Sequence, residues 1–367
     1  MPGFLTASLA PRIRGDFAFG DSALGVAIAL FYVVSATGSV PAGRLVDRLG
    51  AGRGKALAAG FTAICCLAVA AFAQSAPSLT ALLLLGGVGN ALGSPTVSTL
   101  LKQEVAVHRQ GLAFGAQQSG ASLGALLAGL ALPAVAIPFG WRQAFVGAAL
   151  LTLAAAASTP RGAAPRVATA RGTRPRGLTS VHALALAAVL ASAAGVGFVS
   201  FLVSYAVDSG MSEGTAGLLL GGVSLMATLT RIGVGLFADR AGQEPLRLVA
   251  AMLALSVAGY LLLIAGEPAV IALAALLAGA LGWAWPGGLN LAVVQRSPDA
   301  PAWAVGVLMT GLFTGAVAGP LLVGLLAEHD LFSVAWIVCA ASALLAASTL
   351  VATRRREAGG AQPGQTG

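Results

Sequence analysis

The sequence predicts an all-α polytopic membrane protein with two pseudo-symmetric six-helix bundles, the first helix of which is incomplete. Three observations support this fold class: a composition too apolar for a water-facing surface, about eleven long apolar stretches, and a charged motif that occurs twice. The two copies begin at Gly43 and Gly235, 192 residues apart, which is about half the chain. Each copy follows an apolar stretch, so we expect it to form a loop between two membrane spans.

The composition indicates that much of the surface faces lipid. Hydrophobic residues make up 57% of the chain and charged residues only 9%, and the mean hydropathy is +0.88. A soluble domain carries roughly 25% charged residues. The chain also contains 49 glycines, and small residues allow membrane helices to approach one another closely.

About eleven stretches are long and apolar enough to cross a bilayer, which takes ~20 residues. We expect helices, because an unpaired backbone is costly in lipid, and the stretches are too long for barrel strands of ~10 alternating residues. Their expected limits are 24–42, 56–74, 79–101, 111–136, 143–159, 181–205, 215–237, 248–266, 269–294, 303–327 and 332–352.

The distribution of charge predicts the orientation. Most Lys and Arg residues fall in every second connection, whereas the intervening connections hold few basic residues and contain Asp208, Glu213, Glu267, Glu328 and Asp330. The positive-inside rule places the basic connections in the cytoplasm, so we expect a multi-pass protein of the plasma (inner) membrane with its linker and carboxyl terminus inside. The net charge of +8 then reflects topology. It does not indicate nucleic-acid binding, which would need a soluble basic face.

The first helix is expected to be only a stub. The segment from Phe4 to Pro11 is similar to the outer end of a helix, and ten helical residues cover only ~15 Å. No basic residue precedes this apolar segment, which argues against a signal peptide. We therefore expect the true start to lie upstream of Met1, which would complete twelve spans in two sets of six.

The repeat divides the chain into two bundles. Gly115, Gly120 and Gly124 match Gly306, Gly311 and Gly315 at an offset of 191. The intervening segment is rich in arginine and has no acidic residue, as expected of a solvated linker. The expected organisation is a first bundle over 1–158, a basic cytoplasmic linker over 159–180, a second bundle over 181–352 and a cytoplasmic tail over 353–367.

The chain resembles the major facilitator superfamily of secondary transporters. The resemblance is strongest in the run from Gly43 to Arg53, which is similar to the signature segment between the second and third helices of that family. Gly140-Trp141-Arg142 and Gly319-Pro320 are weaker similarities. The resemblance implies the fold of that family, a central cavity and alternating access by rocking of the two bundles.

The resemblance also implies a gate role for the two motif copies, in which charged side chains form contacts when one side of the carrier closes. The alternative is that basic residues such as Arg53 only anchor the topology. A nucleotide-binding loop is excluded, since the run lacks the spacing GxxxxGK[ST] and no strand precedes it. The expected gate residues are Gly43, Asp47, Arg48, Gly50, Arg53, Gly235, Asp239 and Arg240.

Arg231 is the strongest single candidate for contact with a substrate. It lies eight residues before Asp239, hence ~12 Å deeper in the membrane, where ionisable residues usually face a cavity. Its planar guanidinium suits a carboxylate. The alternative is an arginine that snorkels to the cytoplasmic edge. The expected cavity residues are Tyr32, Ser35, Asn90, Gln117, Gln118, Ser224, Thr228, Arg231 and Asn290.

These observations predict a secondary active transporter of a small solute, and the candidate substrate is a small organic anion such as a monocarboxylate. A drug or metabolite efflux carrier and an inactive or sensor-like protein remain as alternatives. We expect no enzyme, since catalytic side chains do not cluster, and no metal or cofactor, since the three histidines are far apart. The expected partners are a small-molecule substrate and the lipid bilayer, with no nucleic acid, and the expected state is a monomer.

Overall fold

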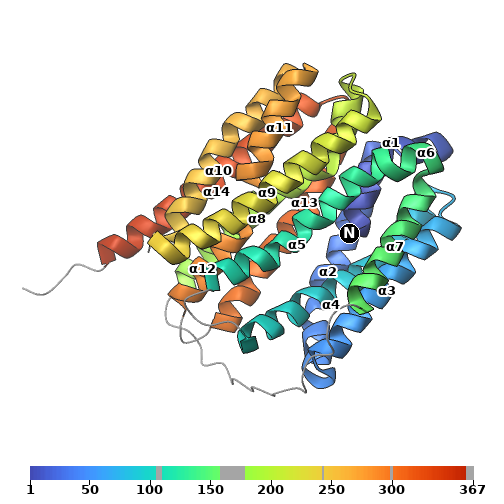
Figure 1. The fold of residues 1–367 in the computed structure, drawn as a ribbon. Coiled ribbons are helices and arrows are strands. Elements are labelled where there is room, and N and C mark those ends of the chain that lie inside the picture. The colour runs from blue at the N-terminus through green and yellow to red at the C-terminus, as the bar shows by residue number, and fades with distance from the viewer. Residues whose placement is uncertain (105–109, 158–177, 242–243, 298–300, 361–367) are drawn as a thin grey trace, which may run out of the picture.

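The computed structural model describes residues 1–104, 110–157, 178–241, 244–297 and 301–360. These residues form two groups of helices that lie side by side (Figure 1). In the described part of the chain, ten helices are long and apolar enough to cross a membrane, and the shorter helix Trp141–Ala157 is also apolar. The expected all-helical fold with a short first helix is confirmed.

The N-terminal half contains six membrane helices when short and interrupted helices are counted. The fifth is interrupted by η2, a π-helical turn that contains Pro133, and such turns commonly bend helices. In order, the elements are α1 (Pro2–Asp16), α2 (Asp21–Leu49), α3 (Ala51–Phe72), α4 (Ala76–Glu104), α5 (Gln110–Ala131), η2 (Leu132–Ala136), α6 (Ile137–Phe139) and α7 (Trp141–Ala157).

The C-terminal half repeats this arrangement. Its fourth span is broken at Trp283–Trp285, and Pro286 starts the next helix, a position that proline favours. In order, the elements are α8 (Leu178–Asp208), α9 (Glu213–Ala241), α10 (Pro245–Leu262) with the 3₁₀ turn η3 (Leu263–Ala265), α11 (Pro268–Gly282), α12 (Pro286–Arg296), α13 (Pro301–Ala327) and α14 (Phe332–Gly360).

One detail of the sequence prediction is wrong. The signature motif does not form a loop: α2 continues through it to Leu49, and Gly50 alone turns the chain into α3 with a φ of 85°, a value that favours glycine. The second motif copy likewise lies at the end of α9. At the end of the chain, α14 likewise continues beyond the apolar stretch to Gly360, so the first residues of the expected tail are helical. In both cases the helix extends past the apolar stretch, since polar residues can continue a helix in water.

The alternating helices bring an excess of acidic residues to one end of the bundle and an excess of basic residues to the other. The acidic end carries Asp16, Asp208, Glu213, Glu267 and Glu328. The opposite end, which we call the basic end, carries Arg48, Arg53, Arg296 and Arg354. This segregation is the pattern on which the predicted orientation depends.

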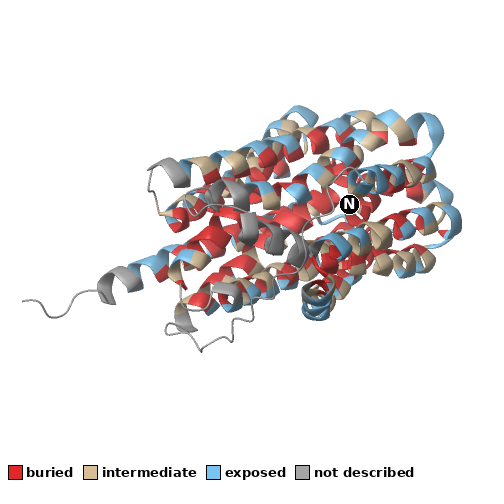
Figure 2. Cartoon of the chain, turned by 60° about the horizontal axis from the view of Figure 1, so that its bottom comes forward, coloured by how far each residue is buried: buried red, intermediate tan, exposed pale blue. Residues whose placement is uncertain are grey.

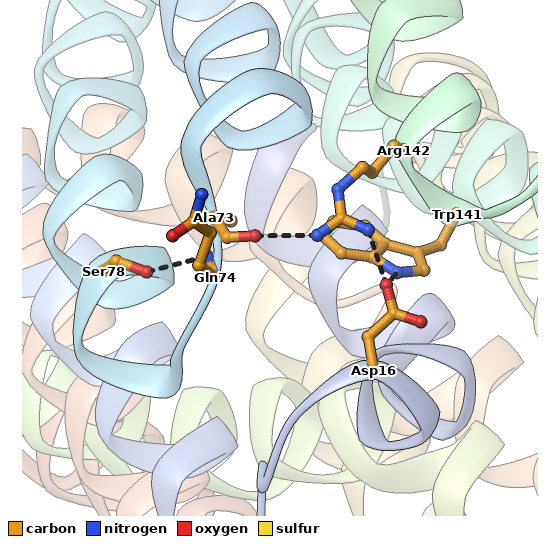
Figure 3. A network of polar contacts seen from close by, with 6 residues as sticks. All are labelled: Asp16, Ala73, Gln74, Ser78, Trp141 and Arg142. Carbon is orange, nitrogen blue, oxygen red and sulfur yellow. Dashed lines mark hydrogen bonds and ion pairs between the residues drawn. The ribbon is translucent and has the colours of Figure 1, made fainter.

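One polar network at the acidic end ties the N-terminal half together (Figure 3). Asp16, the last residue of α1, accepts a hydrogen bond of 2.9 Å from Nε1 of Trp141 and pairs with Arg142. Arg142 also donates to the carbonyl oxygen of Ala73 at the end of α3. The network therefore joins α1, α3 and α7, and explains why Trp141 and Arg142 follow the turn at Gly140.

Buried residues lie along the inward faces of the helices, whereas exposed residues lie mostly on the outside of the bundle (Figure 2). The buried side chains form one core near the acidic end and two separate cores toward the basic end. The first core is shared by both halves and includes Leu9, Phe145, Phe201 and Tyr260. The second lies within the C-terminal half around Trp285. The third lies within the N-terminal half and consists of Ala42, Val46, Ala91 and Leu92. The two halves are thus packed together at the acidic end.

Candidate functional site

Glycines allow the two halves to meet at the acidic end. A Cβ on Gly25 of α2 would collide with the carbonyl oxygen of Pro320 in α13. A Cβ on Gly324, one turn further along α13, would stand 3.1 Å from the Cα of Gly25. On the other side of the interface, Gly129 of α5 packs against Gly217 of α9 in the same manner. Both contacts need a residue without a side chain.

Two polar contacts also join the halves at this end. Arg12 of α1 forms an ion pair with Glu213, the first residue of α9. The carboxylate of Glu328, just after α13, accepts a hydrogen bond of 2.9 Å from the backbone N–H of Ser22 at the start of α2. This bond lowers the pKa of Glu328, since a hydrogen bond to the charged form favours ionisation.

The halves diverge toward the basic end. Along α2, Leu24 and Ile28 are buried, whereas Val40 and Arg44 are exposed. Along α13, Thr310 is exposed although Pro320 is buried. Together with the divided cores, this gradient describes a bundle that is closed at the acidic end and in which α2 and α13 separate toward the basic end, although α5 stays in contact with α12.

Arg231 lies in the middle of the bundle and is only 3% exposed, which is not the geometry of a snorkelling side chain. Its Nη1 donates to the carbonyl oxygen of Gln118 at 2.7 Å and to Oγ of Ser122 at 2.9 Å, both on α5. Its Nη2 donates to the carbonyl oxygen of Trp283, where α11 ends. The guanidinium also lies over the Trp283 ring, 4.9 Å from its centroid. Arg231 thus connects both halves near the membrane centre.

The charge of Arg231 is not balanced by a carboxylate among the described side chains. Its three acceptors are uncharged oxygens, and Nε has no hydrogen-bond partner in the described part of the chain. The carbonyl of Trp283 belongs to the C-terminal end of a helix, which carries a partial negative charge. That dipole compensates only part of a full positive charge.

Thr228 and Ser122 extend this network. Oγ1 of Thr228 lies 2.8 Å from Oγ of Ser122 and 2.9 Å from the carbonyl oxygen of Ser224, and its one proton can be donated to either. The predicted common face of Ser224, Thr228 and Arg231 is therefore directed partly at α5. Ser224 is buried, and its hydroxyl has no partner among the described residues.

The N-terminal candidates form a separate cluster within their own half. Nδ2 of Asn90 donates to Oγ of Ser35 at 3.1 Å, and Oγ of Ser35 lies 2.9 Å from the carbonyl oxygen of Phe31. Tyr32 is partly exposed and contacts Phe313 of α13 across the interface, with ring centroids 6.5 Å apart. The structure brings these residues to mid-membrane depth, but the described hydrogen bonds of Arg231 all go to other residues.

A groove of about 410 Å³ opens beside Asn90 on the basic side of α1. Met1 and Pro2 form its end, and Thr62, Leu127 and Thr152 contribute to its walls. Asn90 is the one cavity candidate that lines it. Gln117 and Gln118 are both partly exposed on α5, and Asn290 is buried, with an Oδ1 that lacks a partner in the described residues.

The motif residues have only partly been located. The side chains of Asp47, Asp239 and Arg240 lie outside those that the structure describes. Arg48 and Arg53 are exposed and form no ion pair with a described residue. No described atom outside its own helix segment lies within 4 Å of a Cβ built on Gly43, so in this conformation no neighbouring helix packs closely against that position. Gly235 is buried in α9.

Sequence reasoning missed Ser122 and the glycine contacts at the acidic end. Ser122 lies four residues after Gln118, hence on the same helix face, but a single serine gives no signal on its own. Gly217 and Gly221 have the four-residue spacing typical of close helix packing, which would have been the usable signal. No group of three or more His, Cys, Asp or Glu residues suited to a metal occurs among the described residues.

Comparisons with known proteins agree with this architecture. The chain can be superimposed on the proton:xylose symporter XylE bound to 6-bromo-6-deoxy-D-glucose with a TM-score of 0.68 and 15% identity, over 96% of this chain and 92% of that one. It can likewise be superimposed on a variant of the E. coli fucose:proton symporter FucP with a TM-score of 0.65 and 16% identity, over 96% and 95% of the two chains. No curated protein sequence matches. The sequence model of the Major Facilitator Superfamily matches residues 1–251 and 184–367, which together span the whole chain, so this protein belongs to the major facilitator superfamily.

Proposed function

We propose that this transporter moves a small organic anion, such as a monocarboxylate, by secondary active transport with alternating access, and that Arg231 attracts the anion. Membership of the family gives the broader activity, membrane transport of a small molecule. The observation that carries the narrower proposal is the buried guanidinium of Arg231, which no described carboxylate balances.

The physical argument is the cost of that charge. An ionised group in the interior of a membrane protein costs several kcal/mol unless it is paired and hydrogen-bonded. Arg231 donates hydrogen bonds to Gln118, Ser122 and Trp283, but its full charge is retained because arginine does not deprotonate in proteins. A bound anion would supply the missing negative charge. A neutral sugar would not.

The conformation supports alternating access. The halves are packed together at the acidic end, and α2 and α13 diverge toward the basic end, which is the arrangement expected of one end state of a rocking carrier. If the basic end faces the cytoplasm, as the positive-inside rule indicates, this state is closed to the outside. We further propose a plasma-membrane location with the linker and carboxyl terminus inside, and a monomer, since one chain supplies both halves.

The experiment begins with a thermal-shift comparison of the purified protein with small carboxylates, neutral sugars and lipophilic cations. A ligand at 100 times its Kd stabilises the native state by roughly 2.7 kcal/mol. We expect a shift with carboxylates in the parent protein and none in Arg231→Ala. Stabilisation by lipophilic cations alone would contradict the proposal and favour drug or metabolite efflux.

Uptake of the stabilising carboxylate into proteoliposomes completes the test. Arg231→Ala should abolish uptake, and Arg231→Lys should retain a fraction, because lysine keeps the charge but not the planar fork. Arg355→Ala is the matched control, since Arg355 is exposed near the end of α14. Uptake by Arg231→Ala with unchanged kinetics would disprove the role of Arg231.

A further inference from the structure

Arg231 is oriented by three oxygen atoms, and only one of them belongs to a side chain. Gln118 and Trp283 contribute backbone carbonyls, which no substitution can remove. Ser122 contributes its hydroxyl, 2.9 Å from Nη1. Among the described residues, Ser122 is therefore the one side chain through which evolution or mutation can change how the guanidinium is hydrogen-bonded.

The Ser122 hydroxyl is suited to this position because it both accepts a hydrogen bond from Arg231 and donates one of its own. Its oxygen accepts from Arg231, lies 2.8 Å from the Thr228 hydroxyl, and donates its own proton to the carbonyl oxygen of Ser119 at 3.1 Å. A serine hydroxyl has one proton and two lone pairs. Ser122 is 0% exposed, and hydrogen bonds in such a low-dielectric setting are strong and directional.

The bond between Ser122 and Arg231 crosses from one half of the carrier to the other. Ser122 belongs to α5 and Arg231 to α9, and these helices pack along the interface that ends at Gly129 and Gly217. Gly129 is seven residues from Ser122, or ~10 Å along α5. Opening of the acidic end must separate Gly129 from Gly217, and will therefore change the position of Ser122 relative to Arg231.

We infer that Ser122 is a positioning residue that orients Arg231 for anion binding while the acidic end is closed, and so makes the affinity of this site depend on the conformation of the carrier. The inference rests on the proposed function. With Nη1 held on α5 and Nη2 held by Trp283, the guanidinium plane is fixed and the Nε edge is the one without a described partner. A guanidinium that is held in one orientation loses less conformational entropy on binding a carboxylate than a mobile guanidinium does.

The test compares the two faces of the carrier in right-side-out and inverted membrane vesicles. The measured quantity is the half-saturation concentration for the carboxylate identified with the parent protein. At the face of the basic end, Ser122→Ala should raise this half-saturation concentration about 10-fold, which is the size expected for loss of one hydrogen bond to a charged group. At the face of the acidic end the change should stay below about 2-fold. Ser122→Thr, which keeps the hydroxyl, should restore the parent value.

Two further variants separate positioning from a general structural role. Ser192 is also a buried serine, but it donates to the carbonyl oxygen of Leu312 within the C-terminal half. Ser192→Ala should leave both half-saturation concentrations unchanged. If Ser122→Ala does not fold, Ser122→Cys keeps the volume of the side chain while weakening the acceptor, and should show the same one-sided increase.

The outcomes distinguish this inference from the proposed function. Unchanged kinetics in Arg231→Ala would disprove both. Loss of uptake in Arg231→Ala together with parent values in Ser122→Ala and Ser122→Cys would disprove the inference alone. An equal increase at both faces, or the same increase in Ser192→Ala, would also overturn it, since it would show loss of packing without dependence on conformation.

Discussion

Gly129 and Gly217 pack backbone against backbone across the boundary between the two halves. A Cβ on Gly129 would stand 2.6 Å from the carbonyl oxygen of Gly217, and a Cβ on Gly217 would stand 2.7 Å from that of Gly129. Side chains do not approach backbone atoms so closely. The closed acidic end therefore depends on the absence of a side chain at these two positions, and any larger residue must push α5 and α9 apart.

Substitution of Gly217 should hold the acidic end open. In Gly217→Val the added atoms meet Gly129 and also Leu132 and Pro133, and overpacking of this kind costs about 1–3 kcal/mol. The closed population should fall by roughly 5- to 150-fold, and transport should fall with it. A cysteine at Ala216, which is buried in the shared core, should react with an impermeant thiol reagent from the acidic side once Cys65, Cys66 and Cys339 are replaced.

Gly221 provides the control for this experiment. It lies one turn from Gly217 on α9, but a Cβ built on it comes no closer than 3.6 Å to any atom, which is ordinary contact. Gly221→Ala should transport at the parent rate and leave the probe at position 216 protected. Normal transport by Gly217→Val would show that the carrier does not need the tight closure seen here.

Reversing the charge of Arg12 should break its ion pair with Glu213, and exchanging the two residues should restore the pair. Both side chains are partly exposed, at 39% and 29%, so we expect a contribution of at most ~1 kcal/mol. Arg12→Glu alone should reduce transport about 2- to 5-fold. Initial uptake rates are measured in a double-mutant cycle. Recovery in the double variant Arg12→Glu/Glu213→Arg would show that this ion pair helps to hold the acidic end closed. Additive losses would contradict that role.

Acid should weaken closure through Glu328. Its pKa is lowered in the closed state, chiefly by the N–H of Ser22 and also by Arg14, so the ionised carboxylate favours closure. That contribution is complete above the ordinary pKa of 4.5 and is lost as the pH falls below it toward the lowered value. Protection of the probe at position 216 should decrease over this range.

Glu328→Gln tests the assignment because it cannot ionise. Protection in this variant should be lower than in the parent protein at pH 7 and should lose its dependence on pH below 4.5. Asp21 and Asp208 also interact with Arg14 near this site, but an unchanged pH profile in Glu328→Gln would show that Glu328 is not the group responsible and would contradict the assignment.

The helices could be predicted from the sequence because their signal is local. Apolar length and the alternation of charge identify the span of α2, although not its continuation to Leu49, since polar residues at a helix end do not by themselves stop a helix. The break in the fourth span of the second half lies directly before Pro286, which begins α12.

The site was less predictable because its contacts join segments that are far apart in sequence. The depth of Arg231 could be read from its distance to Asp239, but its partners Gln118 and Ser122 lie more than 100 residues away. The tight approach of Gly129 to Gly217 likewise depends on how two halves pack. Neither residue reveals this in isolation, because glycine occurs at 49 positions in the chain.

Asp47 should matter when the basic end closes. It lies in the last turn of α2, which ends at Leu49, and a carboxylate there is disfavoured by the dipole of its own helix. This position is favourable only if the carboxylate accepts hydrogen bonds from N–H groups of another helix. Since α2 and α13 diverge at the basic end in this structure, we expect that contact in the other conformation, in which the basic end is closed. Asp47→Asn should therefore lower the maximal transport rate about 10-fold, the equivalent of one charged hydrogen bond. The amount of protein in the membrane should not change. Arg44→Gln, at an exposed position on the same helix end, should transport normally, and an unchanged rate in Asp47→Asn would remove the gate role from the signature motif.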